Sequence, residues 1–106
     1  MTRVRIRLPN VVRAGEPFAV RALITHPMET GLRIDRAGQT VPRGIIHRFT
    51  CTLDLAPVID IAFEPAISAD PFVEFDVLAE RSGRLDFAWY DESGAIHRDS
   101  RDIKVE

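Results

Sequence analysis

The chain has 106 residues, with 14 Lys and Arg against 16 Asp and Glu and a formal net charge of −2. Its 45% hydrophobic and 28% charged residues exclude a disordered chain and predict one folded domain over residues 1–106. The balanced charge argues against binding to nucleic acid, and no apolar run is long enough to cross a membrane.

Alternating apolar and polar residues predict a succession of short strands. Residues 3–8 set three Arg against Val, Ile and Leu, and Phe18–Thr25 follows a turn rich in Gly and Pro. The same alternation predicts strands at 45–55, 58–63, 72–78 and 85–89, and one strand or a pair within 96–105. No window has the spacing of an amphipathic helix, so almost no helix is expected. Seven short strands separated by turns predict an all-β, immunoglobulin-like antiparallel sandwich.

The inward positions of these strands define an expected core, and two segments fall outside it. Residues 64–71 contain a proline near each end and are predicted to be a crossing connection. Residues 27–44 form the one long irregular segment, and connections of that length are usually functional. The residues expected to be mostly buried are Val4, Ile6, Val20, Ile24, Phe49, Cys51, Phe75, Phe87 and Trp89.

The single cysteine, Cys51, excludes a disulfide within the chain and raises the question of a metal site. With His26, Met28, His47 and His97 it suggests blue copper, because such sites combine His, Cys and Met on a β-sandwich. The spacing argues against copper, since the next histidine after Cys51 is His97 and no methionine follows it. We therefore expect a buried core cysteine, with no metal and no cofactor.

Nucleophilic catalysis is also disfavoured by the spacing of the reactive residues. His47 and Cys51 share one face of the predicted strand but lie about 13 Å apart, too far for a hydrogen bond unless the strand bulges. Ser68 lacks the Gly-x-Ser-x-Gly turn of serine hydrolases, and Asp91 and Glu92 are expected to be solvated turn residues. The residues alone therefore predict a non-catalytic sandwich that binds through its long loop.

Four motifs of the chain resemble the Z subunit family of the sulfur-oxidation carrier SoxYZ. They are His26-Pro-Met-Glu-Thr-Gly31, Val41-Pro-Arg43 continuing to Arg48-Phe-Thr-Cys51, Pro65-Ala-Ile-Ser-Ala-Asp-Pro71 and Phe87-Ala-Trp-Tyr-Asp-Glu-Ser-Gly94. The resemblance covers the chain in order and implies an immunoglobulin-like, non-catalytic subunit. It implies pairing with a Y subunit whose C-terminal cysteine arm carries the sulfur intermediates of thiosulfate oxidation, and transient docking with sulfur-oxidation enzymes.

The resemblance also implies that the carrier cysteine and the export signal belong to the Y subunit. Cys51 does not match the carrier cysteine, and residues 101–106 contain no Gly-rich arm. The N-terminus lacks the apolar segment of a secretory signal, which by itself suggests the cytoplasm. The resemblance implies instead that the chain is periplasmic, carried there with the Y subunit.

The long loop is the expected surface for these partners, because it offers an apolar anchor among charged groups. An alternative is an immunoglobulin-like module of another bacterial complex that binds protein through a sheet face. The residues expected to contact a partner are His26, Pro27, Met28, Glu29, Arg43 and Arg48.

Overall fold

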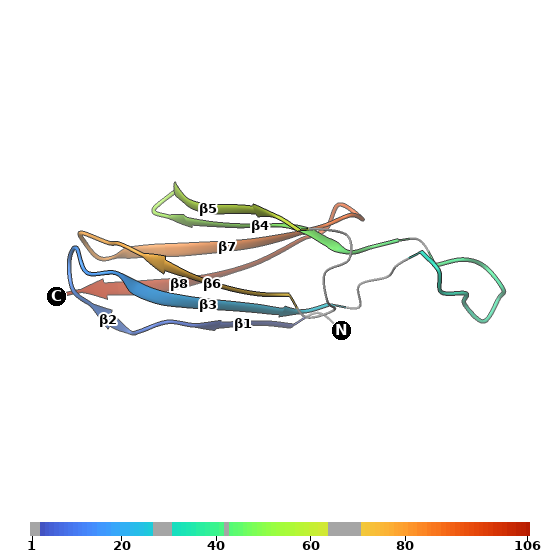
Figure 1. Ribbon diagram of the computed structural model, residues 1–106, viewed down its shortest axis with the longest axis horizontal. Coiled ribbons are helices and arrows are strands. Elements are labelled where there is room, and N and C mark those ends of the chain that lie inside the picture. Colours follow the sequence, from blue (N-terminus) through green and yellow to red (C-terminus); the bar gives the residue numbers. More distant parts are fainter. Residues whose placement is uncertain (1–2, 27–30, 42, 64–70) are drawn as a thin grey trace.

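The computed structural model describes residues 3–26, 31–41, 43–63 and 71–106, and these residues form eight strands and no helix (Figure 1). One sheet has the order β1-β3-β6 and the other β2-β8-β7-β4-β5. All named pairs are antiparallel except the short parallel pair of β2 with β8. The strands are β1 (Arg3–Arg7), β2 (Val11–Val12), β3 (Phe18–Thr25), β4 (Ile46–Leu53), β5 (Ala56–Ala62), β6 (Phe72–Val77), β7 (Gly83–Asp91) and β8 (Ile96–Val105).

The two sheets pack face to face, which confirms the expected immunoglobulin-like sandwich (Figure 1). The crossing connection expected at residues 64–71 lies outside the described residues, except for residue 71. The closing segment, expected to be one strand or a pair, is the single strand β8. In the described part of the chain, no helix has the length and apolarity needed to cross a membrane.

The core forms where the inward faces of β3, β4 and β7 meet. Phe49 lies at its centre, with ring centroids 5.0 Å from Trp89, 6.4 Å from Phe87 and 6.0 Å from Phe75. Each large apolar side chain buried in this way contributes about 1.5–3 kcal/mol to folding. The predicted core residues that are buried are Val20, Ile24, Phe49, Cys51, Phe87 and Trp89, whereas Val4, Ile6 and Phe75 are only partly buried on the edge strands β1 and β6.

A β-bulge at the start of β4 changes the predicted faces of its first residues. Strict alternation would point Ile45 and His47 inward and Ile46 outward. The pairing of β4 with β7 shifts between Ile46 and Arg48, so one residue is added on β4. Ile46 is fully buried as a result, and His47 is exposed. The expectation that His47 shares the inward face with Cys51 is therefore wrong.

The outer face of the smaller sheet is basic along its edge strand β1. Arg3, Arg5 and Arg7 are all exposed, and Arg7 lies opposite Arg21 of β3. Arg21 in turn pairs with Glu74 of β6 at 2.9 Å. The alternation recognised in the sequence thus places one apolar and one strongly basic face on the same short strand.

Candidate functional site

The candidate site lies at the end of the sandwich where β3 and β7 finish and β4 and β8 begin. Residues 31–41 extend beyond both sheets at this end, as the blue-green loop on the right of Figure 1 shows. The described atoms span 58 × 20 × 19 Å, so the loop adds to the long dimension of a narrow molecule. This end therefore offers a partner a surface that stands clear of the core.

Residues 31–41 form a small hairpin, which we call the projecting hairpin. Ile34 and Thr40 form an isolated antiparallel bridge, and the amide of Val41 donates to the carbonyl of Arg33 at 2.8 Å. The Oδ1 atom of Asp35 accepts hydrogen bonds from the amides of Ala37 at 2.9 Å and Gln39 at 3.0 Å. This is the side-chain turn that Asp favours, so the irregular segment expected here carries local order of its own.

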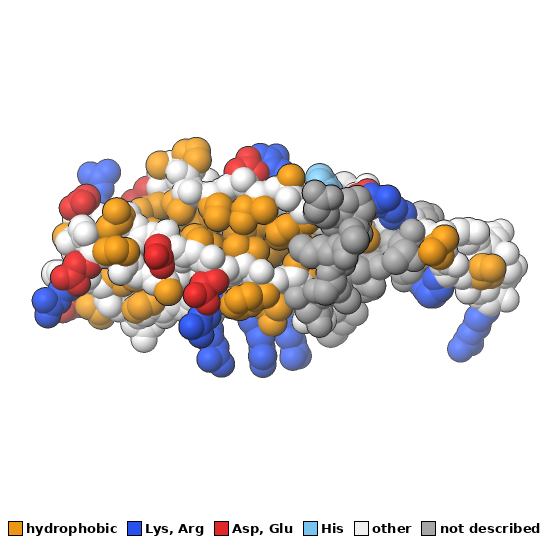
Figure 2. All heavy atoms as spheres, in the orientation of Figure 1, with side chains coloured by type: hydrophobic (Ala, Val, Ile, Leu, Met, Phe, Trp, Pro, Cys, Tyr) orange, Lys and Arg blue, Asp and Glu red, His pale blue; other side chains and the backbone are white. Residues whose placement is uncertain are grey.

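The projecting hairpin presents apolar side chains to solvent. Leu32 is 84% exposed and Ile34 is 65% exposed. Single exposed apolar residues are common on protein surfaces, but these two are separated by one residue on a loop that stands clear of the sheets. In Figure 2 hydrophobic and basic side chains share this end of the molecule. The pair is therefore a candidate anchor for a partner.

Asp91, at the end of β7, joins three segments at the base of this end. Its Oδ2 atom lies 3.4 Å from Nε2 of His26, just after β3, and 3.1 Å from Nε2 of His97 on β8. Its Oδ1 atom accepts hydrogen bonds from the amide of Ser93 at 2.8 Å, the amide of Ala95 at 3.2 Å and the Ser93 hydroxyl. Burial alone would raise the pKa of Asp91, but the hydrogen bonds from Ser93, His97 and His26 outweigh it and lower the pKa to about 2.

Arg43 is held beside this cluster by the turn between β7 and β8. Its Nε atom donates to Oε1 of Glu92 at 2.7 Å, and the amide of Glu92 donates to the carbonyl of Ile45 at 3.0 Å. The hydrogen bond from Arg43 lowers the pKa of Glu92. The Arg43 side chain stays about half exposed, so its unused N–H groups remain accessible to a partner.

Arg48, another predicted contact residue, is paired with a neighbouring strand. Arg48 lies on β4 and makes a two-pronged ion pair with Asp60 of β5, at 2.8 and 2.6 Å, while its guanidinium covers the ring of Tyr90 at 5.0 Å. This pairing lowers the pKa of Asp60. His26 is buried against Asp91, and Pro27, Met28 and Glu29 lie outside the described residues. Sequence reasoning missed Leu32, Ile34 and the joining role of Asp91.

Cys51 occupies the core, as predicted. It is 1% exposed and lies opposite Ile59 of β5 and Phe87 of β7. Burial, together with the charge of Asp86, raises the pKa of its thiol to about 12. A thiolate is the reactive form of cysteine, so this side chain is inert near neutral pH.

The residues that suggested copper in the sequence separate into two groups. His26 and His97 come together on Asp91, while Cys51 and His47 stay apart from them, and Met28 lies outside the described residues. The ligand atoms of His26, Asp91 and His97 all lie within 4.8 Å of one another. Two imidazoles and one carboxylate are a donor set that borderline divalent ions such as Zn²⁺ accept.

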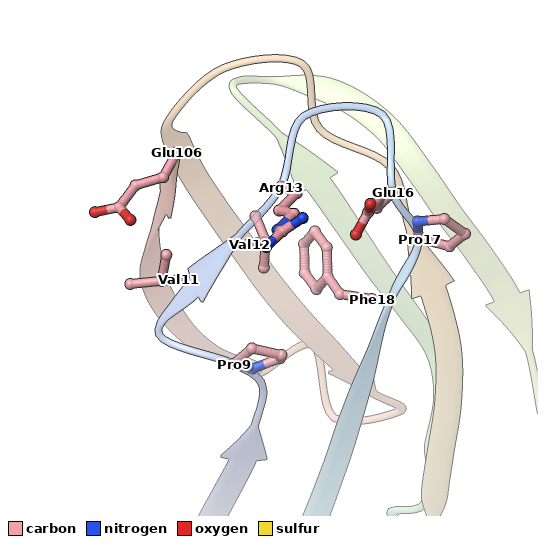
Figure 3. Close-up of a pocket in the computed structure, with 8 residues that line it drawn as sticks. All are labelled: Pro9, Val11, Val12, Arg13, Glu16, Pro17, Phe18 and Glu106. Atoms are coloured by element: carbon pink, nitrogen blue, oxygen red, sulfur yellow. The ribbon is translucent and has the colours of Figure 1, made fainter.

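A pocket lies at the opposite end of the sandwich, between β2 and the start of β3. It has a volume of about 680 Å³, and Val12, Arg13, Glu16 and Phe18 are among its lining residues (Figure 3). Figure 3 shows Phe18 and Val12 side by side, with the carboxylate of Glu106 directed away from them. The contact residues predicted from the sequence and described in the structure do not line this pocket, so the hairpin end remains the candidate.

Comparison with solved structures shows the same fold in redox and sulfur proteins. A superoxide reductase (neelaredoxin) from Ignicoccus hospitalis has a TM-score of 0.75 and 25% identity, with coverage of 97% of this chain and 79% of that one. A putative superoxide reductase from Thermotoga maritima has a TM-score of 0.69 and 20% sequence identity, and the match covers 97% of this chain and 85% of that one. The sulfur carrier protein SoxY from Chlorobium limicola f thiosulfatophilum has a TM-score of 0.69 and 15% sequence identity, and the match covers 96% of this chain and 74% of that one.

Comparison with protein families is decisive for the affiliation of the chain. No curated protein matches it significantly. A family model described as "Sulphur oxidation protein SoxZ" matches residues 6–102, which is nearly the whole length. The match confirms the resemblance carried by the four motifs, and the family is one of non-catalytic subunits. This chain belongs to the SoxZ family of sulphur oxidation proteins.

Proposed function

We propose that this chain is the Z-type subunit of a sulfur carrier and that it acts by binding a Y-type subunit. On this proposal, the C-terminal cysteine arm of the Y subunit carries the covalent sulfur intermediates, and this chain supports the arm and adds docking surface. Membership of the SoxZ family supports the assignment to sulfur oxidation. The buried Cys51, with a thiol pKa of about 12, supports leaving the sulfur chemistry to the partner.

The place of action that fits this role is the periplasm. Sulfur-oxidation systems of this family generally work there. We propose that the chain reaches the periplasm in complex with the Y subunit, which bears the export signal. Folding and pairing would then precede export.

The observation that carries the binding role is the projecting hairpin. Leu32 and Ile34 are exposed apolar side chains on a loop whose turn is already closed by Asp35 and by the bridge of Ile34 with Thr40. A loop ordered before binding loses less entropy on association, so more of the contact energy appears as affinity. Arg43 stands at the base of the hairpin as a charged group for the rim of an interface.

Two further binding roles are compatible with the same fold, one at the hairpin end and one at a sheet face. Sulfur-oxidation enzymes would dock transiently on the hairpin end when they visit the arm of the partner. The alternative, a module of another bacterial complex, would bind through a sheet face. Figure 2 shows hydrophobic side chains gathered over β4, β5 and β6, where Ile59, Ile61 and Phe75 are only partly buried. The experiment below separates these surfaces.

We would co-express the chain with the Y-type protein of the same source and measure the affinity of the two subunits. The variant L32S/I34S should raise Kd at least tenfold, because each buried apolar anchor contributes about 1–2 kcal/mol to binding. L55S is the matched control, since Leu55 is 82% exposed in the turn between β4 and β5. Its affinity should match that of the unmodified chain.

The possible outcomes distinguish a failure of the proposed pairing from a failure of the proposed binding surface. A stable complex that L32S/I34S leaves at full affinity would move the interface from the hairpin to a sheet face. Failure of the unmodified subunits to associate would remove the proposed pairing itself. Circular dichroism and thermal unfolding of each variant would show that the folds are equivalent.

A further inference from the structure

The cluster of His26, Asp91 and His97 brings two imidazoles to a single carboxylate. Three segments contribute to it: the residue after β3, the last residue of β7 and the second residue of β8. His26 and Asp91 are buried, and the two imidazoles meet edge to face with centroids 5.5 Å apart. Both rings turn the same nitrogen, Nε2, toward one carboxylate oxygen, Asp91 Oδ2.

The two distances from imidazole to carboxylate are compatible with metal ligands as well as with hydrogen bonds. Hydrogen bonds to a carboxylate from a charged donor are usually about 2.7–2.9 Å long. The two Nε2···Oδ2 distances are 3.1 and 3.4 Å. A tetrahedral ion with bonds of about 2.0–2.1 Å separates its ligand atoms by about 3.3 Å, which is close to these two distances. The ligand atoms of the three residues all lie within 4.8 Å of one another, so a bound ion would have to draw the two imidazoles closer together.

The surroundings of Asp91 also resemble those of a ligating carboxylate. Its second oxygen, Oδ1, is held by the amides of Ser93 and Ala95 and by the Ser93 hydroxyl, which leaves Oδ2 directed at the imidazoles. Hydrogen bonds of this kind orient the ligands of metal sites and strengthen their binding. An ion can enter from the His97 side, where the side chain is 24% exposed.

We propose that this cluster binds one divalent ion of the zinc class through His26 Nε2, His97 Nε2 and Asp91 Oδ2, with water in the fourth position. The ion would join the ends of β3, β7 and β8 directly below the projecting hairpin. The site differs from the copper arrangement that the sequence suggested, because Cys51 and His47 take no part and an aspartate does.

The test is a titration of the metal-free full chain with Co²⁺ and then with Zn²⁺. One Co²⁺ should bind per chain and give the strong visible absorption of a four-coordinate ion, and Zn²⁺ should displace it. Saturating Zn²⁺ should raise the Tm, because an ion that binds only the folded chain stabilises it. H97A should weaken binding by roughly 100-fold and abolish the rise in Tm, and D91N should do the same.

The chain supplies its own matched control in His47, the third histidine, which is exposed on β4. H47A should bind Co²⁺ with unchanged affinity and an unchanged spectrum. Because Asp91 is buried, D91N is informative only if it folds, and the partly exposed His97 keeps the test decisive. Absence of one-to-one binding, or a spectrum that H97A leaves unaltered, would overturn the proposal.

Discussion

At the scale of single residues, Cys51 shows how burial determines chemistry. Cys51 lies on β4 between β5 and β7, opposite Ile59 and Phe87, and its Sγ atom is 4.0 Å from the carbonyl oxygen of Thr52. Burial disfavours the thiolate, and this is the main reason that the pKa rises to about 12. The residue therefore acts as a small apolar group of the core.

The first consequence is a cost for any polar replacement at Cys51. C51S should lower the free energy of unfolding by about 1–3 kcal/mol, because a buried hydroxyl would lack a partner. C51A should cost less, since it buries no polar atom. Urea unfolding of the three proteins measures both differences.

Thiol labelling provides an independent check of the same property. A thiol reagent should modify Cys51 slowly in the folded chain and rapidly in denaturant, because only unfolding exposes the thiol. Rapid labelling of the folded chain would contradict the core assignment and would restore a reactive role for the cysteine.

Asp91 marks the limit of what the sequence predicts at this scale. Its place at the start of a turn predicts a solvated side chain, whereas it is buried and contacts His26, 65 positions earlier in the chain. Turn chemistry is local and can be recognised from neighbouring residues, as the hydrogen bonds of Asp91 to Ser93 and Ala95 show. Which strand ends meet depends on sheet order, and no single-residue pattern encodes that order.

At the scale of elements, alternation predicted the strands well and their irregularities poorly. β3 coincides with its predicted bounds, because a strand with one buried face alternates without interruption. The bulge in β4 leaves no such trace, since Ile45 and Ile46 are both apolar and either could point inward. β2 is only two residues long and depends on its pairing with β8, so a period of two cannot reveal it.

The junction between β4, β5 and β7 gives a prediction about elements. A side chain at Gly83 would meet the Asp54 carboxylate, with its Cγ and Oδ1 atoms both 2.8 Å from the new Cβ. The same Oδ1 accepts the amide of Arg84 at 2.9 Å and thereby fixes the start of β7. G83A should therefore lower the free energy of unfolding by about 1–2 kcal/mol, because the carboxylate must turn away from that amide.

A double-mutant cycle distinguishes this contact from a general intolerance of alanine. D54G removes the carboxylate and suits the positive φ of 47° at that position. In the D54G background, G83A should cost much less than it does alone, which is the signature of coupled neighbours. Equal costs in the two backgrounds would show that the clash with Asp54 is not the cause.

At the scale of the whole molecule, the projecting hairpin and the single cysteine lie in different parts of the structure. The hairpin extends from one end of a narrow sandwich (Figure 1). The only cysteine of the chain, Cys51, is buried in the core. The proposed complex therefore requires that covalent sulfur resides on another polypeptide. This requirement can be tested without knowledge of the interface.

Intact-mass spectrometry after treatment with thiosulfate-loading enzymes is the direct measurement. The isolated chain should gain no sulfur mass, and in the heterodimer only the Y subunit should gain it, because the Cys51 thiol is buried and protonated. A heterodimer carrying C51A should load to the same extent. A thiosulfonate adduct on Cys51 itself would contradict the proposal that only the Y subunit carries sulfur.

The arginines of β1 have a consequence for how the subunit behaves among copies of itself. An edge strand with free backbone groups invites another strand to add to it, which is the first step of aggregation. β1 carries Arg3, Arg5 and Arg7 in alternation, so two such edges brought together would align rows of like charge. This repulsion should disfavour the addition of one β1 edge to another, and with it the stacking of chains into fibrils.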